Sequence, residues 1–412
     1  MNEPQAFQTA PRRRALLTVF LTILLDLIGF GMILPFLTFY AQEFHATPLQ
    51  IGLLFSSYSL TQLLCAPLLG RLSDRVGRRP VLLASIAGSA ISYVIFALAP
   101  SYAVLLLARS LSGVAAANYA IAQAYMADVS SPAERSKAMG LVGAAFGLGF
   151  VLGPALGGIL EQAGGVLPAL AHLGPRVVPF AAATLSAINL LIASFSLPES
   201  LSPELRRDAA SRGGAWHGIS DLREVWRDTP LRGLMVLFFL VMFCFSMMET
   251  TLALFCQARF GFGARETSWL FVFVGVVLVI VQGGLLGRLV RRFGERRLIL
   301  SGIVLMALGL LLLPGSQLWL LLVGLLLLAV GQGVHNPSTT GLLSRLTDER
   351  SQGSTIGLSR SFGALARILG PSAGTFLFSA AGPGWPFWSA GLLMVVALVV
   401  AIDVLRKVTV PV

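Results

Sequence analysis

Long apolar segments alternate with short charged connections along the whole chain. Each segment is close to the ~20 helical residues that cross the ~30 Å hydrocarbon core of a bilayer. Dividing the chain at Gly, Pro and charged clusters gives twelve of them: residues 15–40, 48–69, 81–99, 102–127, 136–160, 177–197, 233–256, 267–286, 298–314, 317–342, 353–380 and 384–405. The pattern predicts an all-α integral membrane protein with twelve transmembrane helices.

Composition agrees with a membrane location. Hydrophobic residues make up 56% of the 412 residues and charged residues only 12%, against roughly 25% charged in soluble domains. The net charge of +11 comes from Lys and Arg in the short connections, as in residues 12–14 and 70–80. Excess basic residues mark cytoplasmic loops, so we expect both termini in the cytoplasm, a bacterial-type inner membrane and no nucleic-acid partner.

The two halves of the sequence are related at a fixed offset. Gly70, Gly77 and Gly153 recur 217 residues later as Gly287, Gly294 and Gly370. The only long hydrophilic segment, 198–232, separates the copies. The repeat predicts an N-terminal six-helix half (1–197), a cytoplasmic linker (198–232) and a C-terminal six-helix half (233–412). Parallel repeats of this kind occur in secondary transporters.

Five charged side chains lie in the connection 70–80. Asp74 and Arg78 are four residues apart, so they meet on one face if the second helix continues through them. Asp128, at the cytoplasmic end of the fourth segment, is the natural second carboxylate, and Arg78 would then lie between two acids as a latch. The alternative is that these charges only set the topology. In the second copy Arg291 replaces the acid, which predicts a weaker or differently paired latch.

Ionisable residues also occur inside apolar segments. Asp26 lies eleven residues into the first one, where a charge costs about 2.5–3.5 kcal/mol by insertion scales. It persists there if it is paired, protonated or facing a cavity, and it could carry a proton. The alternative is a structural carboxylate. Arg109 needs a partner for the same reason, and Glu249 is the acid of the C-terminal half, with Arg367 as a candidate partner.

Several polar or adaptable side chains lie in segments 4, 7, 10 and 11. His335 lies 217 residues after Asn118, which places the two at equivalent positions. A membrane-embedded His is also a common hydrogen-bonded packing residue. The candidates for a substrate cavity are Asn118, Tyr119, Met248, Gln332, His335, Asn336 and Arg360.

The sequence Gly-Arg-Leu-Ser-Asp-Arg-Val-Gly-Arg-Arg-Pro at 70–80 resembles the signature loop of the major facilitator superfamily. The resemblance implies the twelve-helix fold of that family, in two pseudo-symmetric halves. It also implies that Asp74, Arg75, Arg78 and Asp128 control the change between inward- and outward-facing states. Arg109 followed by Gly113 resembles the family's fourth-helix motif, which implies a role in proton coupling beside Asp26 and Glu249.

The fifth segment is rich in small residues and contains a proline. Gly149, Gly153, Pro154, Gly157 and Gly158 resemble the antiporter signature of drug-efflux members of the family. Together with Leu-Asp-x-x-Gly-x-Gly at 25–31, they make the chain most similar to the tetracycline-efflux-like drug:proton antiporters. The resemblance implies proton-coupled export of amphipathic, drug-like molecules by alternating access.

A proton symporter or facilitator for a sugar, organic acid or lipid uses the same fold and is the alternative. No nucleophile–base set or metal-ligand spacing is found in the sequence, so we expect no enzyme activity, no metal and no cofactor. The expected partners are a small-molecule substrate, protons and the lipid bilayer, with the chain as a monomer.

Overall fold

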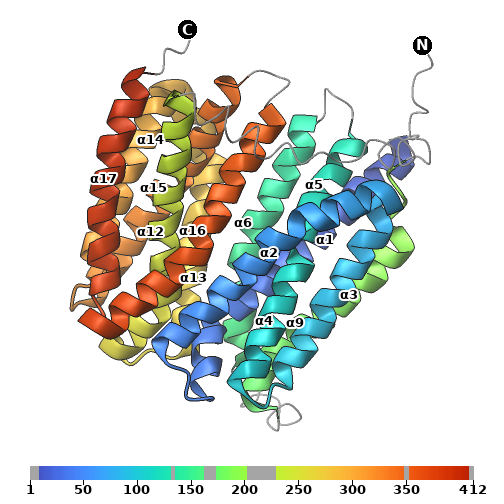
Figure 1. Cartoon of the computed structure of the whole chain (residues 1–412), viewed down its shortest axis with the longest axis horizontal. Helices are drawn as coiled ribbons and strands as arrows, with labels where there is room; N and C mark the ends of the chain where they lie inside the picture. The colour runs from blue at the N-terminus through green and yellow to red at the C-terminus, as the bar shows by residue number, and fades with distance from the viewer. Residues whose placement is uncertain (1–8, 131–134, 162–172, 202–228, 348–351, 408–412) are drawn as a thin grey trace. The chain divides into compact units, whose positions relative to one another are not determined.

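The computed structural model describes residues 9–130, 135–161, 173–201, 229–347 and 352–407. Regular structure within these ranges is helical throughout, with no strand (Figure 1). The described residues form two compact units, 9–40 with 60–201 and 41–59 with 229–407. Residues 202–228 of the predicted linker lie outside the described part of the chain.

The first unit packs helices from the N-terminal part of the sequence. A core of Val19, Leu82, Ile121 and Tyr125 joins α1, α3 and α5, and α3 packs against α4 and α9. The helices are α1 (Thr9–Gln42), α2 (Pro48–Val76), α3 (Arg78–Ala97), α4 (Tyr102–Ala116), α5 (Asn118–Asp128), α6 (Arg135–Glu161) and α9 (Val177–Ser196), with a 3-10 turn at Gly174–Arg176.

The second unit has a larger apolar core, in which α14 packs against α15 and α17, and α12 packs against α16 and α17. The start of α2 belongs to it: the Ser56 hydroxyl donates to Ile368 O over 2.6 Å. Its other helices are α12 (Thr229–Phe260), α13 (Ala264–Val279), a π-helical turn (Ile280–Leu285), α14 (Leu286–Leu312), α15 (Leu318–Arg345), α16 (Gln352–Ala381) and α17 (Trp385–Lys407).

Ten helical stretches of the described chain are long and apolar enough to cross a membrane. One of them, Ala264–Leu312, has 49 residues and would be about 74 Å long as a straight helix, more than twice the thickness of the hydrocarbon core. Gly294, with φ 74°, breaks it at the second charged connection, which gives two spans. The remaining predicted span, α16, carries Arg360 and Arg367 and is not among the ten.

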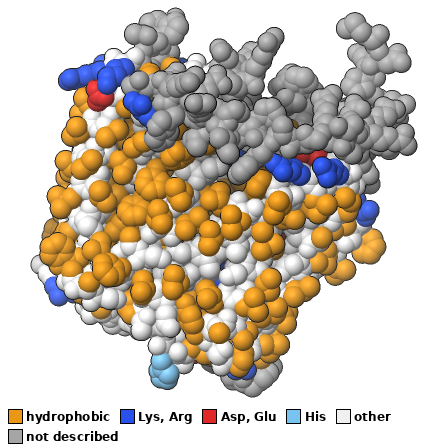
Figure 2. All heavy atoms as spheres, viewed as in Figure 1, with side chains coloured by type: hydrophobic (Ala, Val, Ile, Leu, Met, Phe, Trp, Pro, Cys, Tyr) orange, Lys and Arg blue, Asp and Glu red, His pale blue; other side chains and the backbone are white. Residues whose placement is uncertain are grey.

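Two details refine the sequence prediction. The second helix does continue through the connection 70–80: α2 extends to Val76 and α3 begins at Arg78, with only Gly77 between them. The fourth segment is interrupted at Ala117, between α4 and α5. Apolar side chains such as Leu68 and Val399 are exposed on the helix surfaces, and hydrophobic side chains cover much of the face in Figure 2, as expected of helices that face lipid.

Candidate functional site

Asp26 is held on α1 by amides from two other helices of the first unit. Nδ2 of Asn118, the first residue of α5, donates to Oδ2 of Asp26 over 2.9 Å. Nδ2 of Asn189 on α9 donates to Oδ1 over 3.1 Å. Asn118 is 6% exposed and Asn189 is completely buried. Each carboxylate oxygen therefore has a donor, an arrangement that suits the ionised form, which can only accept hydrogen bonds.

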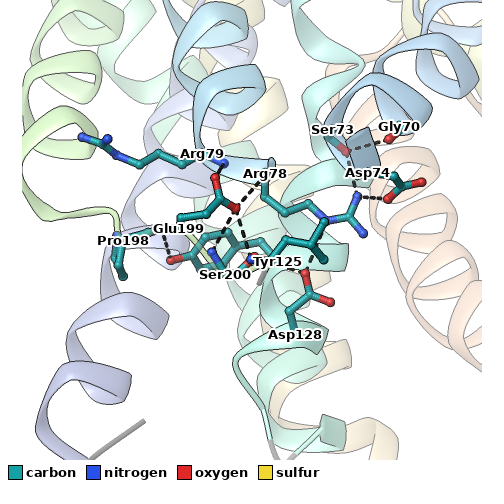
Figure 3. Close-up of polar contacts among 11 residues, drawn as sticks. Gly70, Ser73, Asp74, Arg78, Arg79, Tyr125, Asp128, Pro198, Glu199 and Ser200 are labelled. Atoms are coloured by element: carbon teal, nitrogen blue, oxygen red, sulfur yellow. Dashed lines mark hydrogen bonds and ion pairs between the residues drawn. The ribbon is translucent and has the colours of Figure 1, made fainter. Parts of the chain in front are cut away.

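Arg78 lies between two acids, as the spacing of these residues suggested. Its Nη1 is 2.6 Å from Oδ1 of Asp74, and its Nε is 3.3 Å from Oδ2 of Asp128. Nη1 also donates to the buried hydroxyl of Ser73 over 2.7 Å. In Figure 3 the Arg78 side chain extends between the two carboxylates. Because its side chain is only 12% exposed, the pairing is better shielded from water than an ordinary surface ion pair.

The turn at Gly77 makes this pairing possible. Gly77 has φ 117°, a conformation that residues with a side chain rarely adopt. α3 begins directly after Gly77, and its first amides point at Glu199. The N–H groups of Arg78 and Arg79 donate to that carboxylate over 2.9 and 3.2 Å (Figure 3). A carboxylate at a helix N-terminus satisfies unpaired amides and the helix dipole.

The segment after α9 also holds the end of α5. The Tyr125 hydroxyl donates to Pro198 O over 2.8 Å, and the Ser200 hydroxyl donates to Oδ2 of Asp128 over 3.1 Å. The latch thus joins the α2–α3 turn, α5 and residues 198–200. In the described structure Arg75 is exposed and forms no ion pair.

The second unit contains an ion pair at the equivalent place. Nη2 of Arg345 is 2.8 Å from Oε1 of Glu295. These residues lie 217 positions after Asp128 and Arg78, and the two members of each pair are 50 residues apart. The charges are reversed: the acid now follows the turn and the arginine ends the long helix. The C-terminal copy is therefore differently paired, and Arg291 is exposed.

Glycines bring α6 into close contact with α1. A Cβ added at Gly153 would lie 2.7 Å from Gly31 Cα and 2.8 Å from Ile28 O, and one at Gly157 would lie 2.9 Å from Met32 O. Gly149 meets Leu27 in the same way, and Pro154 packs beside Gly31. Gly158 is also buried. Four of the five residues of the predicted antiporter motif, Gly149, Gly153, Pro154 and Gly157, thus form the seam against the helix that carries Asp26.

The second unit repeats this seam between α16 and α12. A Cβ at Gly370 would lie 2.9 Å from Phe243 O, and one at Gly374 would lie 3.1 Å from Met247 O. Glu249 is on the same helix, α12, and is half-buried. Arg367 of α16 is near enough for a charge–charge attraction to Glu249. Arg367 therefore stays a candidate partner of Glu249.

The other predicted residues are spread through the two units. Arg109 is 1% exposed on α4, nine residues before Asn118, which is about 13 Å of helix. Tyr119 meets Phe146 edge-on, with ring centroids 6.3 Å apart. His335 is buried, and its Nδ1 lies 3.4 Å from Ile299 O, a contact that a hydrogen-bonded packing residue would also make. Met248 and Gln332 are buried, Asn336 is half-buried and Arg360 is exposed.

Sequence reasoning missed two residues that the structure places in these clusters. Asn189 belongs to no motif, and its only signal was that it is an amide near the middle of an apolar segment, as Asp26 is an acid near the middle of its own. Glu199 lies at the start of a hydrophilic segment, where carboxylates are common and one of them gives no signal. Matching polar residues by their depth in the membrane could have found Asn189.

Comparisons with known proteins fit this architecture. The family model described as "Major Facilitator Superfamily" matches residues 19–292 and 283–411. The chain belongs to the major facilitator superfamily. It is 34% identical over 375 residues to the class C tetracycline resistance protein of Escherichia coli, covering 90% of this chain and 91% of the relative. It is 31% identical to the human major facilitator superfamily domain-containing protein 10, covering 95% and 93%.

Solved structures of family members have the same fold. The crystal structure of the human organic anion transporter MFSD10 (TETRAN) matches with a TM-score of 0.70 at 30% identity, over 95% of this chain and 99% of that one. A bacterial homologue of the human lysosomal transporter Spinster, in an inward-facing and unoccupied conformation, matches with a TM-score of 0.76 at 17% identity, over 98% and 100%. The protein is thus a multi-pass membrane transporter of this superfamily.

Proposed function

We propose that the protein is a proton-coupled antiporter that exports amphipathic, drug-like molecules by alternating access. The observation that carries the proposal is the carboxylate of Asp26, held by Asn118 and Asn189 inside an apolar helix bundle. The similarity to a tetracycline resistance protein along nine-tenths of the chain favours a drug-like substrate and export.

Proton binding at Asp26 would change the energy of the bundle by removing a buried charge. A charge in a low-dielectric interior is costly unless it is paired, so the protonated and ionised forms favour different surroundings. Substrate binding would favour the state that the proton does not. In this scheme Arg109 modulates Asp26, and Glu249, beside Arg367, is a second acid that can change its charge during the cycle.

The charged clusters are the proposed gates. In the N-terminal half, 1–197, the cytoplasmic ends of helices would be held by Asp74, Arg75, Arg78 and Asp128. In the C-terminal half, 233–412, they would be held by Glu295 and Arg345. Breaking and re-forming these pairs would let the cavity open to one side at a time. The linker 198–232 would join the halves, and both termini would lie in the cytoplasm of a cell with a proton gradient at its plasma membrane.

A second candidate function is the transport of organic anions. It is favoured by the 30% identity and TM-score of 0.70 to a protein described as an organic anion transporter. In that case the chain would be a symporter or facilitator, and the basic residues of α16 would be the first candidates for holding the anion.

The test is transport by the purified full chain in proteoliposomes with an imposed pH difference. The probes are tetracycline, a lipophilic cationic dye and an anionic dye, with pH recorded inside the vesicles. Antiport predicts that a probe accumulates on the side that protons leave. Movement of probe and protons in the same direction would establish symport instead, and a flux that ignores the pH difference would establish facilitated diffusion. Asp403→Asn, an exposed acid at the end of α17, is the control variant.

A further inference from the structure

The two oxygens of Asp26 face amides that are not equivalent. Asn189 uses its Nδ2 twice, donating to Oδ1 of Asp26 over 3.1 Å and to the backbone carbonyl of Thr22 over 3.2 Å. Thr22 lies one helical turn before Asp26 on α1. Asn118 donates only to Oδ2 of Asp26 among the described residues. The two asparagines therefore differ in what fixes their orientation.

A carbonyl oxygen can only accept a hydrogen bond. If the Asn189 amide turned over, its own oxygen would face the Thr22 carbonyl, and two acceptors would meet in a buried place. Thr22 O thus keeps the amide of Asn189 a donor towards α1. Within the described part of the chain no second acceptor fixes the Asn118 amide, so it can turn and offer Oδ1 as an acceptor to an O–H group.

A protonated carboxyl group has one O–H donor and one oxygen that only accepts. Oδ1 faces a fixed donor, so it can accept a hydrogen bond both when Asp26 is ionised and when Asp26 is protonated on its other oxygen. Oδ2 meets an amide that can donate to the ionised form or, after turning, accept from the protonated one. We propose that Asn189 is a positioning residue that keeps Oδ1 of Asp26 an acceptor, so that the proton binds at Oδ2, on the side of Asn118.

The inference rests on the proposed role of Asp26 as the proton carrier, and it adds which oxygen binds the proton and what decides this. Other titratable side chains on the surrounding helices are few. α9 has none between Val177 and Ser196, and α6 has none between residues 138 and 160. Near the ends of their helices lie Arg78 and Arg79 of α3, Tyr102 of α4 and Asp128 of α5, and further in lie Tyr93 of α3, Arg109 of α4, and Tyr119 and Tyr125 of α5.

The test measures the protonation of Asp26 directly, without a substrate. Hydrophobic carbodiimides react with protonated carboxyl groups, and Asp26 is the only acid between residues 4 and 42, so mass spectrometry can assign its label. The pH midpoint of labelling is compared for the wild-type chain, Asn189→Leu, Asn118→Leu and the control Ser186→Ala, which changes a buried residue of α9 that donates nothing to Asp26.

The hydrogen bond from Asn189 is stronger to the ionised carboxylate of Asp26 than to its protonated form. Asn189→Leu removes this bond, so the pH midpoint of labelling should move about one unit to higher pH. Asn118→Leu removes a partner from both forms, so its midpoint should move clearly less, and Ser186→Ala should not move it. Asn189→Ala replaces Asn189→Leu if the larger side chain prevents folding.

An unchanged midpoint in a folded Asn189 variant would overturn the proposal, even if transport were lost, because the residue would then be structural. Equal shifts in the Asn189 and Asn118 variants would overturn the assignment of the proton to Oδ2. Neither result depends on whether the protein exports, so failure of the inference is distinct from failure of the proposed function.

Discussion

Arg345 lies 2.8 Å from Glu295, in an ion pair that has the position of the Arg78–Asp128 pair with the charges exchanged. Both pairs connect the residue after a charged turn with the last residue of another helix, α5 or α15. Since either polarity occurs at this place, attraction between the two elements matters more than which of them carries the cation. Both copies of the repeat therefore contain this contact, with the acid and the arginine exchanged.

This relationship predicts that the C-terminal pair tolerates exchange. Glu295→Arg or Arg345→Glu alone places like charges together and should lower the initial transport rate about two- to fivefold, the range expected for a partly exposed pair. The double variant should recover most of the rate. The rates are compared in proteoliposomes at equal amounts of protein.

The exchange of Asp403 and Lys407 is the control, since they form an exposed pair on one face of α17. It should leave the rate unchanged. A Glu295–Arg345 double variant no better than the single variants would show that attraction between these two residues is not what the contact supplies.

The N-terminal latch should be the more sensitive one. Arg78 bonds two carboxylates and the Ser73 hydroxyl with little exposure to water, so Arg78→Gln leaves several acceptors unsatisfied. We expect a loss of turnover of about tenfold, a smaller loss for Asp74→Asn, and none for Arg71→Gln, which changes an exposed arginine of α2. Unaltered turnover in Asp74→Asn would remove Asp74 from the gate.

The seam between α1 and α6 can be tested through stability. An added methyl group at Gly153 would meet the backbone of Gly31 and Ile28 at under 3 Å, and backbone cannot move aside cheaply. Gly153→Ala should therefore cost about 1–3 kcal/mol of overpacking and lower the thermal unfolding temperature in detergent. Gly143→Ala, on the same helix with nothing within 4 Å of the added atom, should leave it unchanged; equal effects would contradict the close packing.

Much of this architecture could be predicted from the sequence, because it depends on local or repeated features. The spans follow from the length of apolar segments, and the Arg78 latch follows from a four-residue spacing that a helix brings together. The 217-residue offset identified the two glycine seams as a repeat. In each case a short pattern carries the structural information.

Other features depend on tertiary packing and had no local signal. Asn189 is a single amide in an apolar helix, and only the packing of α9 on α1 makes it a partner of Asp26. The break at Ala117 has no proline or glycine to mark it. The Glu295–Arg345 pair has its acid and its arginine exchanged relative to Arg78–Asp128, so matching residue types at the 217-residue offset does not reveal it.

Glu249 on α12 and Arg367 on α16 should stabilise each other's charges. Glu249→Gln removes the acid near Arg367 and leaves the cation less compensated, so the unfolding temperature should fall by several degrees. Arg367→Gln added to it should restore part of the loss. Purely additive losses in the double variant would argue against a direct interaction.

The central claim is that Asp26 carries the coupling proton, and the most direct test is substrate-driven proton movement in proteoliposomes containing Asp26→Asn. The amide has nearly the shape of the acid but cannot bind and release a proton. The account predicts that exchange of labelled for unlabelled substrate continues, while proton movement and uphill transport are lost. Uphill transport by Asp26→Asn with an unchanged pH dependence would contradict it.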